Sequence, residues 1–317
     1  MIESYNMKNF GEVVRTIRRS LNMTQKDVRD RVGISENALM KLEKGQVIPK
    51  YETLELLSLA YKIDLMALFL KYRYDTSLET IMVKADEAII NNQPQILQQC
   101  HEQYFEYLKS GDHRDLINSS DLDLLECFLA NAAKYYHHNL KDFQIQAMIE
   151  NIRATLQRVN PDMKWHKLDK GRFNLWEIRL LILLALLEGN LDHYDVSIRI
   201  LESIYLRFKS LRKQVVREQK VFLIALFNLS YHYHVTDQFD KALEIAEAGI
   251  DYAKETSDFT LLHALYYRKG IAQYLLGQAN YLDALRFAVT MLEIQDKQEM
   301  AKLYRTVSKD NYQIEIP

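Results

Sequence analysis

Residues 15–49 read RTIRRSLNMTQKDVRDRVGISENALMKLEKGQVIP, and this stretch decides the fold of the first part of the chain. Thr24 is placed to cap the helix that follows it, because its hydroxyl can accept from a backbone N–H of the first turn. Gly33 stands where a helix end favours a residue that tolerates left-handed geometry. Ser35 can cap a further helix that ends near Gly45. Together with the apolar periodicity on either side, the pattern predicts five short helices, over 8–21, 25–32, 35–45, 51–61 and 65–70.

A set of residues in this stretch keeps a recognisable spacing: Arg15, Arg18, Thr24, Gln25, Val28, Gly33, Ile34, Ser35, Leu39, Leu42, Glu43, Gly45 and Pro49. The set resembles the helix-turn-helix of phage repressors and Cro, the large xenobiotic-response-element-type family. The resemblance implies a lambda-repressor-like domain that binds DNA. Its third helix would lie in the major groove, which admits one α-helix.

The leading residues of that third helix are the candidates for reading base edges. Asn37 can pair with adenine through two hydrogen bonds, Ala38 can meet a thymine methyl, and Lys41 can meet guanine. Glu36 departs from the glutamine that many relatives carry there, and phosphates repel a carboxylate unless it accepts from cytosine. Gln25 begins a helix whose N–H groups can hold a phosphate. The predicted DNA-binding residues are Gln25, Lys26, Ser35, Glu36, Asn37, Ala38, Lys41 and Lys44.

Arg18 and Glu43 match a pair that, in repressors of this family, forms a partly buried ion pair. The resemblance implies that the pair joins the first helix to the end of the third. It would fix the recognition helix in place without touching bases.

The charge of the chain is unevenly distributed. Its net charge is −2, yet Lys8–Lys50 holds ten Lys or Arg against five Asp or Glu, a net of about +5. A basic segment on an acidic remainder indicates nucleic-acid contact at one end. The N-terminus lacks the basic-then-apolar run of a signal peptide. The most apolar run, 180–187, is shorter than the roughly 20 residues that span a bilayer. We therefore expect a cytoplasmic protein without membrane contact.

From about residue 76 the pattern changes to longer helices in pairs. The predicted pairs are 76–91 with 94–110, 121–138 with 141–158, 174–188 with 194–209, 215–235 with 239–254, and 259–276 with 281–294. Their regular spacing is typical of an α-solenoid of helix hairpins. The predicted fold is all-α, with a helix-turn-helix domain over 1–70, a linker over 71–77, and a sensor and dimerisation domain over 78–317. Strand alternation is suggested only in the last residues, 313–316.

The clearest repeat runs from Leu226 to Gly249 and reads LxxLSxxYxxxDxFxxAxxxAxxG. It resembles the tetratricopeptide pattern, in which small residues let the two helices of a hairpin approach closely. A second, weaker copy uses Ile271, Ala272, Tyr281, Ala284 and Ala288. We therefore expect about five tetratricopeptide-like hairpins.

A helix-turn-helix joined to such an array resembles the peptide-pheromone-responsive regulators of Gram-positive bacteria and their phages, the Rgg, NprR, PlcR and PrgX family. In that family a short secreted peptide is re-imported and binds the concave surface of the repeats. The resemblance implies a sequence-specific transcription regulator whose activity is controlled by a short signalling peptide.

Two asparagines give an independent reason to expect a peptide site. Residues 129–137 match residues 226–234 at several positions, which places Asn131 and Asn228 at the same point of two hairpins. An asparagine inside an apolar helix needs partners for its amide, and the backbone of an extended peptide offers a donor and an acceptor. Bridging of neighbouring helices is the alternative. The predicted peptide-binding residues are Asn131, Lys134, Arg179, Asn228, Tyr231, Tyr267 and Lys269.

One helix-turn-helix module contacts too few base pairs for specificity on a genome. We therefore expect a homodimer on an inverted-repeat operator in double-stranded DNA. Two alternatives to peptide control stay open: the repeats bind a protein partner, or the chain is a constitutive phage-type repressor.

The sequence does not indicate an enzyme. It holds neither the phosphate-binding loop of P-loop proteins nor a dinucleotide fingerprint. Neither His137-His138 nor the pair His232 and His234 has the i, i+4 spacing of a helical metal site. We expect no metal and no cofactor.

Overall fold

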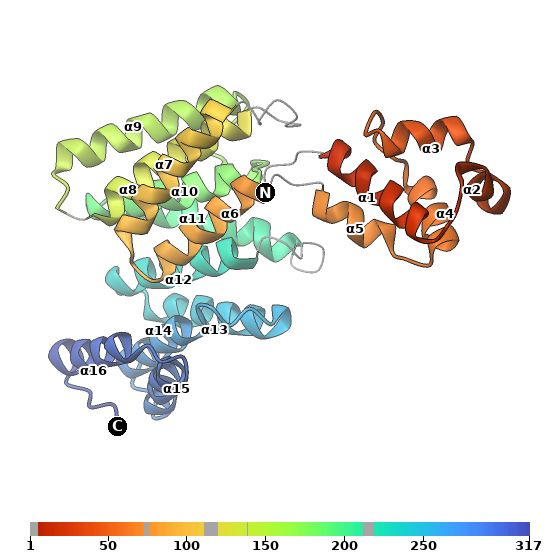
Figure 1. The fold of residues 1–317 in the computed structure, drawn as a ribbon. Coiled ribbons are helices and arrows are strands. Elements are labelled where there is room, and N and C mark those ends of the chain that lie inside the picture. The colour runs from red at the N-terminus through yellow and green to blue at the C-terminus, as the bar shows by residue number, and fades with distance from the viewer. Residues whose placement is uncertain (1–5, 73–75, 111–119, 138, 212–218) are drawn as a thin grey trace. The chain divides into compact units, whose positions relative to one another are not determined.

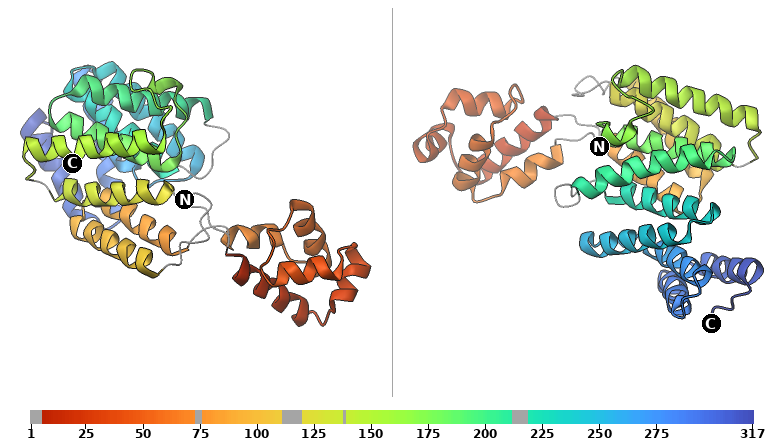
Figure 2. Two further views of the ribbon diagram at one scale, coloured as in Figure 1. Left: turned by 90° about the horizontal axis from the view of Figure 1, so that it is seen from above. Right: turned by 180° about the vertical axis from the view of Figure 1, so that it is seen from behind.

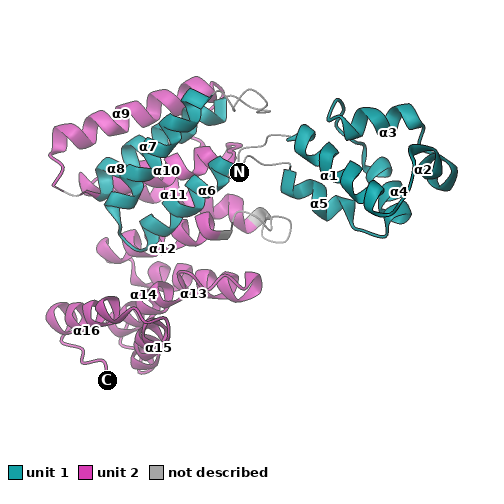
Figure 3. Ribbon diagram, viewed as in Figure 1, with its two compact units in different colours: residues 1–136 teal, residues 137–317 magenta. Residues whose placement is uncertain are grey.

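The computed structural model describes residues 6–72, 76–110, 120–137, 139–211 and 219–317. All regular secondary structure within these ranges is helical. The chain divides into two compact units, residues 1–136 and 137–317 (Figure 3).

The first five helices of unit 1 have a core of their own. They are α1 (Met7–Ser20), α2 (Gln25–Val32), α3 (Glu36–Glu43), α4 (Tyr51–Tyr61) and α5 (Leu65–Tyr72). Phe10, Val28, Leu39, Leu57 and Leu65 lie at the centre of this core, each at most 1% exposed. The five predicted helices are confirmed, with ends shifted by no more than two residues.

Two glycines allow α1 to lie directly against the end of α3. A Cβ on Gly11 would stand 2.5 Å from the carbonyl oxygen of Leu42. Gly45 follows α3 with a φ of +68°, and a Cβ there would stand 2.6 Å from the backbone of Lys8. Backbone contact this close leaves no room for a side chain.

Three longer helices complete unit 1: α6 (Thr76–Ile90), α7 (Pro94–Ser110) and α8 (Ser120–Tyr136). α7 packs on both α6 and α8. The hydroxyl of Tyr104 donates to the carbonyl of Leu122 at 2.8 Å. Within the expected linker, α5 extends to Tyr72 and α6 begins at Thr76, and residues 73–75 lie outside the described residues.

Unit 2 is an array of helices in which each packs on the next (Figures 1 and 2). Alternate helices also touch, α10 with α12 and α12 with α14. This is the arrangement of stacked helix hairpins, and it confirms the predicted helical array. The helices are α9 (Asp142–Val159), the 3₁₀-helix η2 (Leu168–Lys170), α10 (Leu175–Asn190), α11 (Tyr194–Leu211), α12 (Gln219–Val235), α13 (Phe239–Thr256), α14 (Leu262–Leu275), α15 (Tyr281–Ile294) and α16 (Gln298–Tyr312).

The last part of the chain differs from the prediction. The helix α16 was not expected, because it carries little aliphatic periodicity and packs largely through tyrosines. The suggested strand over 313–316 was wrong. This segment is irregular backbone that folds back, with Ile314 and Ile316 buried in the core formed by α14, α15 and α16.

Candidate functional site

Side-chain caps fix the lengths of α2 and α3. The Thr24 hydroxyl accepts from the backbone N–H of Asp27 at 3.1 Å, and the Asp27 carboxylate accepts from the backbone N–H of Thr24 at 2.7 Å. Gly33 ends α2 with a φ of +75°. The Ser35 hydroxyl then accepts from the N–H of Ala38 at 3.2 Å and starts α3. These caps set the sharp turn between the two helices.

One face of α3 is buried and the other is open. Leu39 and Leu42 enter the core, whereas Asn37, Ala38 and Lys41 are exposed. Lys44 follows α3 and is exposed, as is Lys26 on α2. The open face therefore combines an amide, a methyl group and an ammonium group, which are groups that recognise base edges in a major groove.

A buried ion pair anchors the end of α3 to α1. The Arg18 Nε lies 2.6 Å from Oε1 of Glu43, and one Nη lies 2.9 Å from Oε2, so the pair is bidentate. The other Arg18 Nη donates to the carbonyl of Met23 at 2.7 Å. Hydrogen bonding to Glu43 raises the pKa of Arg18. Arg18 and Glu43 are 7% and 5% exposed, so the pair is well shielded from water.

Gln25, predicted to contact phosphate, joins this network. Its side-chain amide donates to Oε2 of Glu43 at 2.9 Å. The N–H groups at the start of α2 stay candidates for binding a phosphate.

Glu36, the exception in the predicted reading face, is paired with a cation. Its carboxylate lies 2.6 Å from an Nη of Arg29 on α2. Arg29 also pairs with Asp30 at 2.9 Å, so it offsets only part of the negative charge that would repel a phosphate backbone.

We expect Asn37→Ala and Lys41→Ala each to weaken binding to the specific operator by about 1–3 kcal/mol, because each side chain is predicted to contact a base edge. Binding to random-sequence DNA should change little. Fluorescence anisotropy with both duplexes measures the two affinities. Lys71→Ala, an exposed lysine on α5, is the charge control. If both variants bind the operator as tightly as the wild type, α3 does not read the sequence.

The family comparison agrees with this geometry. Residues 14–68 match the model of the helix-turn-helix family. Residues 14–68 form a helix-turn-helix domain. A search of curated protein sequences finds no match to the chain.

Solved structures extend the comparison to nearly the whole chain. One is Bacillus thuringiensis PlcR in complex with the peptide PapR7 and DNA, at 14% identity and a TM-score of 0.66, covering 93% of this chain and 99% of PlcR. A second is ComR from S. thermophilus with DNA and its signalling peptide ComS, at 12% identity and 0.58, covering 94% and 97%. A third is the Streptococcus dysgalactiae pheromone receptor Rgg2, at 12% identity and 0.57, covering 94% and 97%. The chain has the fold of these proteins.

The predicted peptide-binding residues fall in both units. Asn131 and Lys134 lie on α8 of unit 1, and the other five lie in unit 2. Asn131 is buried, and its amide donates to the carbonyl of Cys127 at 2.7 Å. Asn228 makes the same bond to Ile224 at 2.8 Å and stays half-exposed. Both asparagines thus bond their own helix, and the second N–H of the Asn228 amide remains for another partner.

Within unit 2 the other predicted residues differ in their exposure and in their partners. Tyr231 lies one turn beyond Asn228 on α12 and is 36% exposed. Tyr267 is buried, with its hydroxyl 3.0 Å from that of Ser308. Lys269 instead pairs with Glu247 on α13 at 2.8 Å. Arg179 is buried on α10, with its guanidinium 5.6 Å from the centre of the Trp176 ring.

Arg268, which the sequence analysis missed, is the cation that lies against Tyr231. Its guanidinium is 4.5 Å from the centre of the Tyr231 ring and 5.0 Å from that of Phe227. A signal in the sequence existed. When Phe239 is aligned with Tyr281 and Ala242 with Ala284, Arg268 falls on Leu226, which is fully buried. A charge at a core position of a repeat indicates a special role.

His232 on α12 and His263 on α14 are buried, and His234 on α12 is half-buried. Burial, followed by the charge of Arg268, lowers the pKa of His232 to about 4. Burial, followed by Lys297, lowers the pKa of His263 to about 4. The Ser197 hydroxyl donates to the carbonyl of Ala185 at 2.7 Å, so it must accept from Nδ1 of His232 at 2.6 Å. The His232 proton therefore sits on Nδ1.

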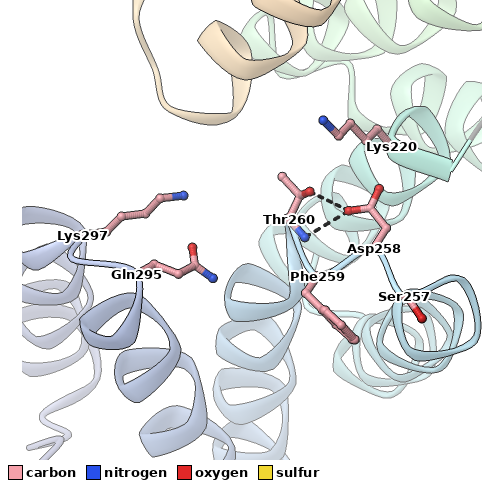
Figure 4. Close-up of a pocket in the computed structure, with 7 residues that line it drawn as sticks. All are labelled: Lys220, Ser257, Asp258, Phe259, Thr260, Gln295 and Lys297. Carbon is pink, nitrogen blue, oxygen red and sulfur yellow. Dashed lines mark hydrogen bonds between the residues drawn. The ribbon is translucent and has the colours of Figure 1, made fainter.

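A pocket of about 540 Å³ lies elsewhere in unit 2 (Figure 4). Lys220 and Lys297 line it, and the Asp258 carboxylate accepts from the backbone N–H and the hydroxyl of Thr260. None of the predicted peptide-binding residues lines it.

Two features are absent from the described part of the chain. No helix there is long and apolar enough to cross a membrane. No group of three or more His, Cys, Asp or Glu in the same ranges is arranged to hold a metal ion.

Proposed function

We propose that this chain is a cytoplasmic transcription regulator that binds an inverted-repeat operator as a homodimer through α3. A short signalling peptide, bound in unit 2 by the helix that carries Asn228 and Tyr231, controls its affinity for the operator. The chain carries out no catalysis in this account.

The observation that supports the proposal is that one chain joins a helix-turn-helix domain to a helical array. The helix-turn-helix domain presents an open α3 held by a buried ion pair, and a helical array follows it. Proteins of the same fold have been solved with both DNA and a signalling peptide.

The helical array supports control by a ligand. Each hairpin packs on its neighbours, so small rotations add along the array. A ligand that prefers one curvature shifts the population of dimer geometries and thereby the affinity for DNA.

Mass spectrometry of the protein purified from its native cells tests the proposal. The protein is first weighed intact under native conditions and then denatured to release what it carries. We expect a peptide of about five to ten residues, an extended segment whose backbone groups need partners when bound. A co-purified folded protein would instead support a protein partner, and a chain recovered without any ligand would support a constitutive repressor.

A further inference from the structure

Arg268 carries a positive charge that has no counter-charge among the described residues. Burial lowers its pKa, and the groups that act on it electrostatically are the hydroxyls of Tyr304, Tyr231, Tyr267 and Tyr312. No carboxylate among the described residues pairs with it. Its Nε is buried and has no hydrogen-bond partner in the same ranges.

An unneutralised cation in such surroundings is costly to the folded state. Buried charges in proteins are normally paired, because removal from water costs several kcal/mol per ion. The faces of Phe227 and Tyr231 recover part of this cost through cation–π attraction. An anion would recover much more, since a guanidinium offers a planar fork of donors to a carboxylate.

The surroundings of Arg268 are fixed and polar. The helix α16 is held by Tyr312, 2.9 Å from Nε2 of His234, and by Tyr304, 3.1 Å from Nδ1 of His263. The other nitrogen of each histidine is buried and has no partner among the described residues. Both histidines are neutral at physiological pH because burial lowers their pKa.

The residues around this cation keep part of their surface exposed. Arg268, Tyr304 and Tyr312 are half-buried, and Tyr231 is exposed. Tyr231 also belongs to the face of α12 that carries Asn228. This face of α12 thus offers an amide for a peptide backbone, and the Arg268 cation of α14 lies against its Tyr231 ring.

We propose that Arg268 binds a carboxylate of the peptide ligand, with the aromatic rings of Phe227 and Tyr231 shielding the pair from water. This assignment rests on the proposed function. The carboxylate belongs either to the C-terminus of the peptide or to an Asp or Glu side chain, and the experiment separates these sources.

Affinity selection with three pools of random synthetic heptapeptides tests the assignment. The first pool has a free C-terminus and no Asp or Glu. The second is amidated and has no Asp or Glu, and the third is amidated with one Asp or Glu. The full-length chain is incubated with each pool, separated from unbound peptide by gel filtration, and analysed by mass spectrometry.

We expect the wild type to retain peptides from the first or the third pool at least about 10-fold better than from the second. Retention from the first pool identifies a C-terminal carboxylate, and from the third a side chain. Arg268→Gln should lose about 10- to 100-fold in affinity for the selected peptides, the strength of a charge-assisted pair. Lys302→Gln, which removes an exposed charge on α16, should retain them.

The possible failures are distinguishable. Equal retention from all three pools, or unchanged affinity in Arg268→Gln, would overturn the assignment and leave peptide control standing. No retention from any pool would overturn both.

A second measurement separates a binding role from a structural one. Both tryptophans, Trp165 and Trp176, lie in unit 2, so tryptophan fluorescence reports its unfolding. Without peptide, Arg268→Met should unfold at the same or a higher urea concentration than the wild type, because it removes an unneutralised charge. A clearly lower midpoint would mean that Arg268 serves the fold, and would contradict the assignment.

Discussion

Glu43→Ala is expected to destabilise the helix-turn-helix domain by about 3–5 kcal/mol, because it leaves the Arg18 guanidinium buried without its carboxylate. The loss is a large part of the roughly 5–15 kcal/mol that holds a typical domain folded. The Gln25 amide also loses its acceptor. Operator binding should fall together with the stability, since α3 is no longer tied to α1.

Hydrogen exchange read by mass spectrometry over residues 7–72 measures this effect. The tryptophan fluorescence of unit 2 should report an unchanged unfolding midpoint, which provides an internal control. The double variant Arg18→Met with Glu43→Leu should lose less stability than the sum of the losses in Arg18→Met alone and Glu43→Leu alone. Strict additivity would show that the two side chains do not interact.

Lowering the pH from 7.5 to 5 should cost unit 2 about 2 kcal/mol for each of His232 and His263. Burial depresses the pKa of both in the folded state to about 4, whereas an unfolded histidine titrates near 6.5. Between about pH 4 and about pH 6.5 the unfolded chain therefore binds more protons than the folded chain. Stability is therefore full above about pH 6.5 and falls as the pH drops toward 4.

Urea unfolding followed by tryptophan fluorescence across this pH range tests the expectation. His263→Gln should remove the contribution of His263 to this pH dependence. The free energy of unfolding should then fall less steeply as the pH is lowered. His166→Gln, at an exposed position, should leave the slope unchanged. An unchanged slope in His263→Gln would mean that His263 titrates normally in the folded chain.

The sequence was most informative where structure is local. Thr24, Gly33 and Ser35 are caps whose partners lie within a few residues, and each lies at a helix end. Likewise, the apolar periodicity of the paired helices depends only on a single face of each helix. These elements were predictable because no distant contact decides them.

The less predictable features depend on contacts across the array. Neighbouring residues on a helix point about 100° apart. Selecting Tyr267 and Lys269 from the sequence therefore passed over Arg268, the residue between them that meets α12. The position of α16 is set by tyrosine hydroxyls that reach α12 and α14, such as Tyr312 to His234. The tyrosine contacts of α16 leave no periodic trace in the chain, and Arg268 is marked only as a charge at a core position of the repeat.

A peptide bound to the helical array is expected to change operator affinity. Fluorescence anisotropy tests this with the full-length protein, an operator selected from random DNA, and a synthetic copy of the peptide recovered from native cells. We predict that a saturating concentration of the peptide shifts operator affinity at least about 5-fold, while the affinity for random-sequence DNA stays the same. An operator affinity identical with and without saturating peptide would show that the peptide does not control DNA binding.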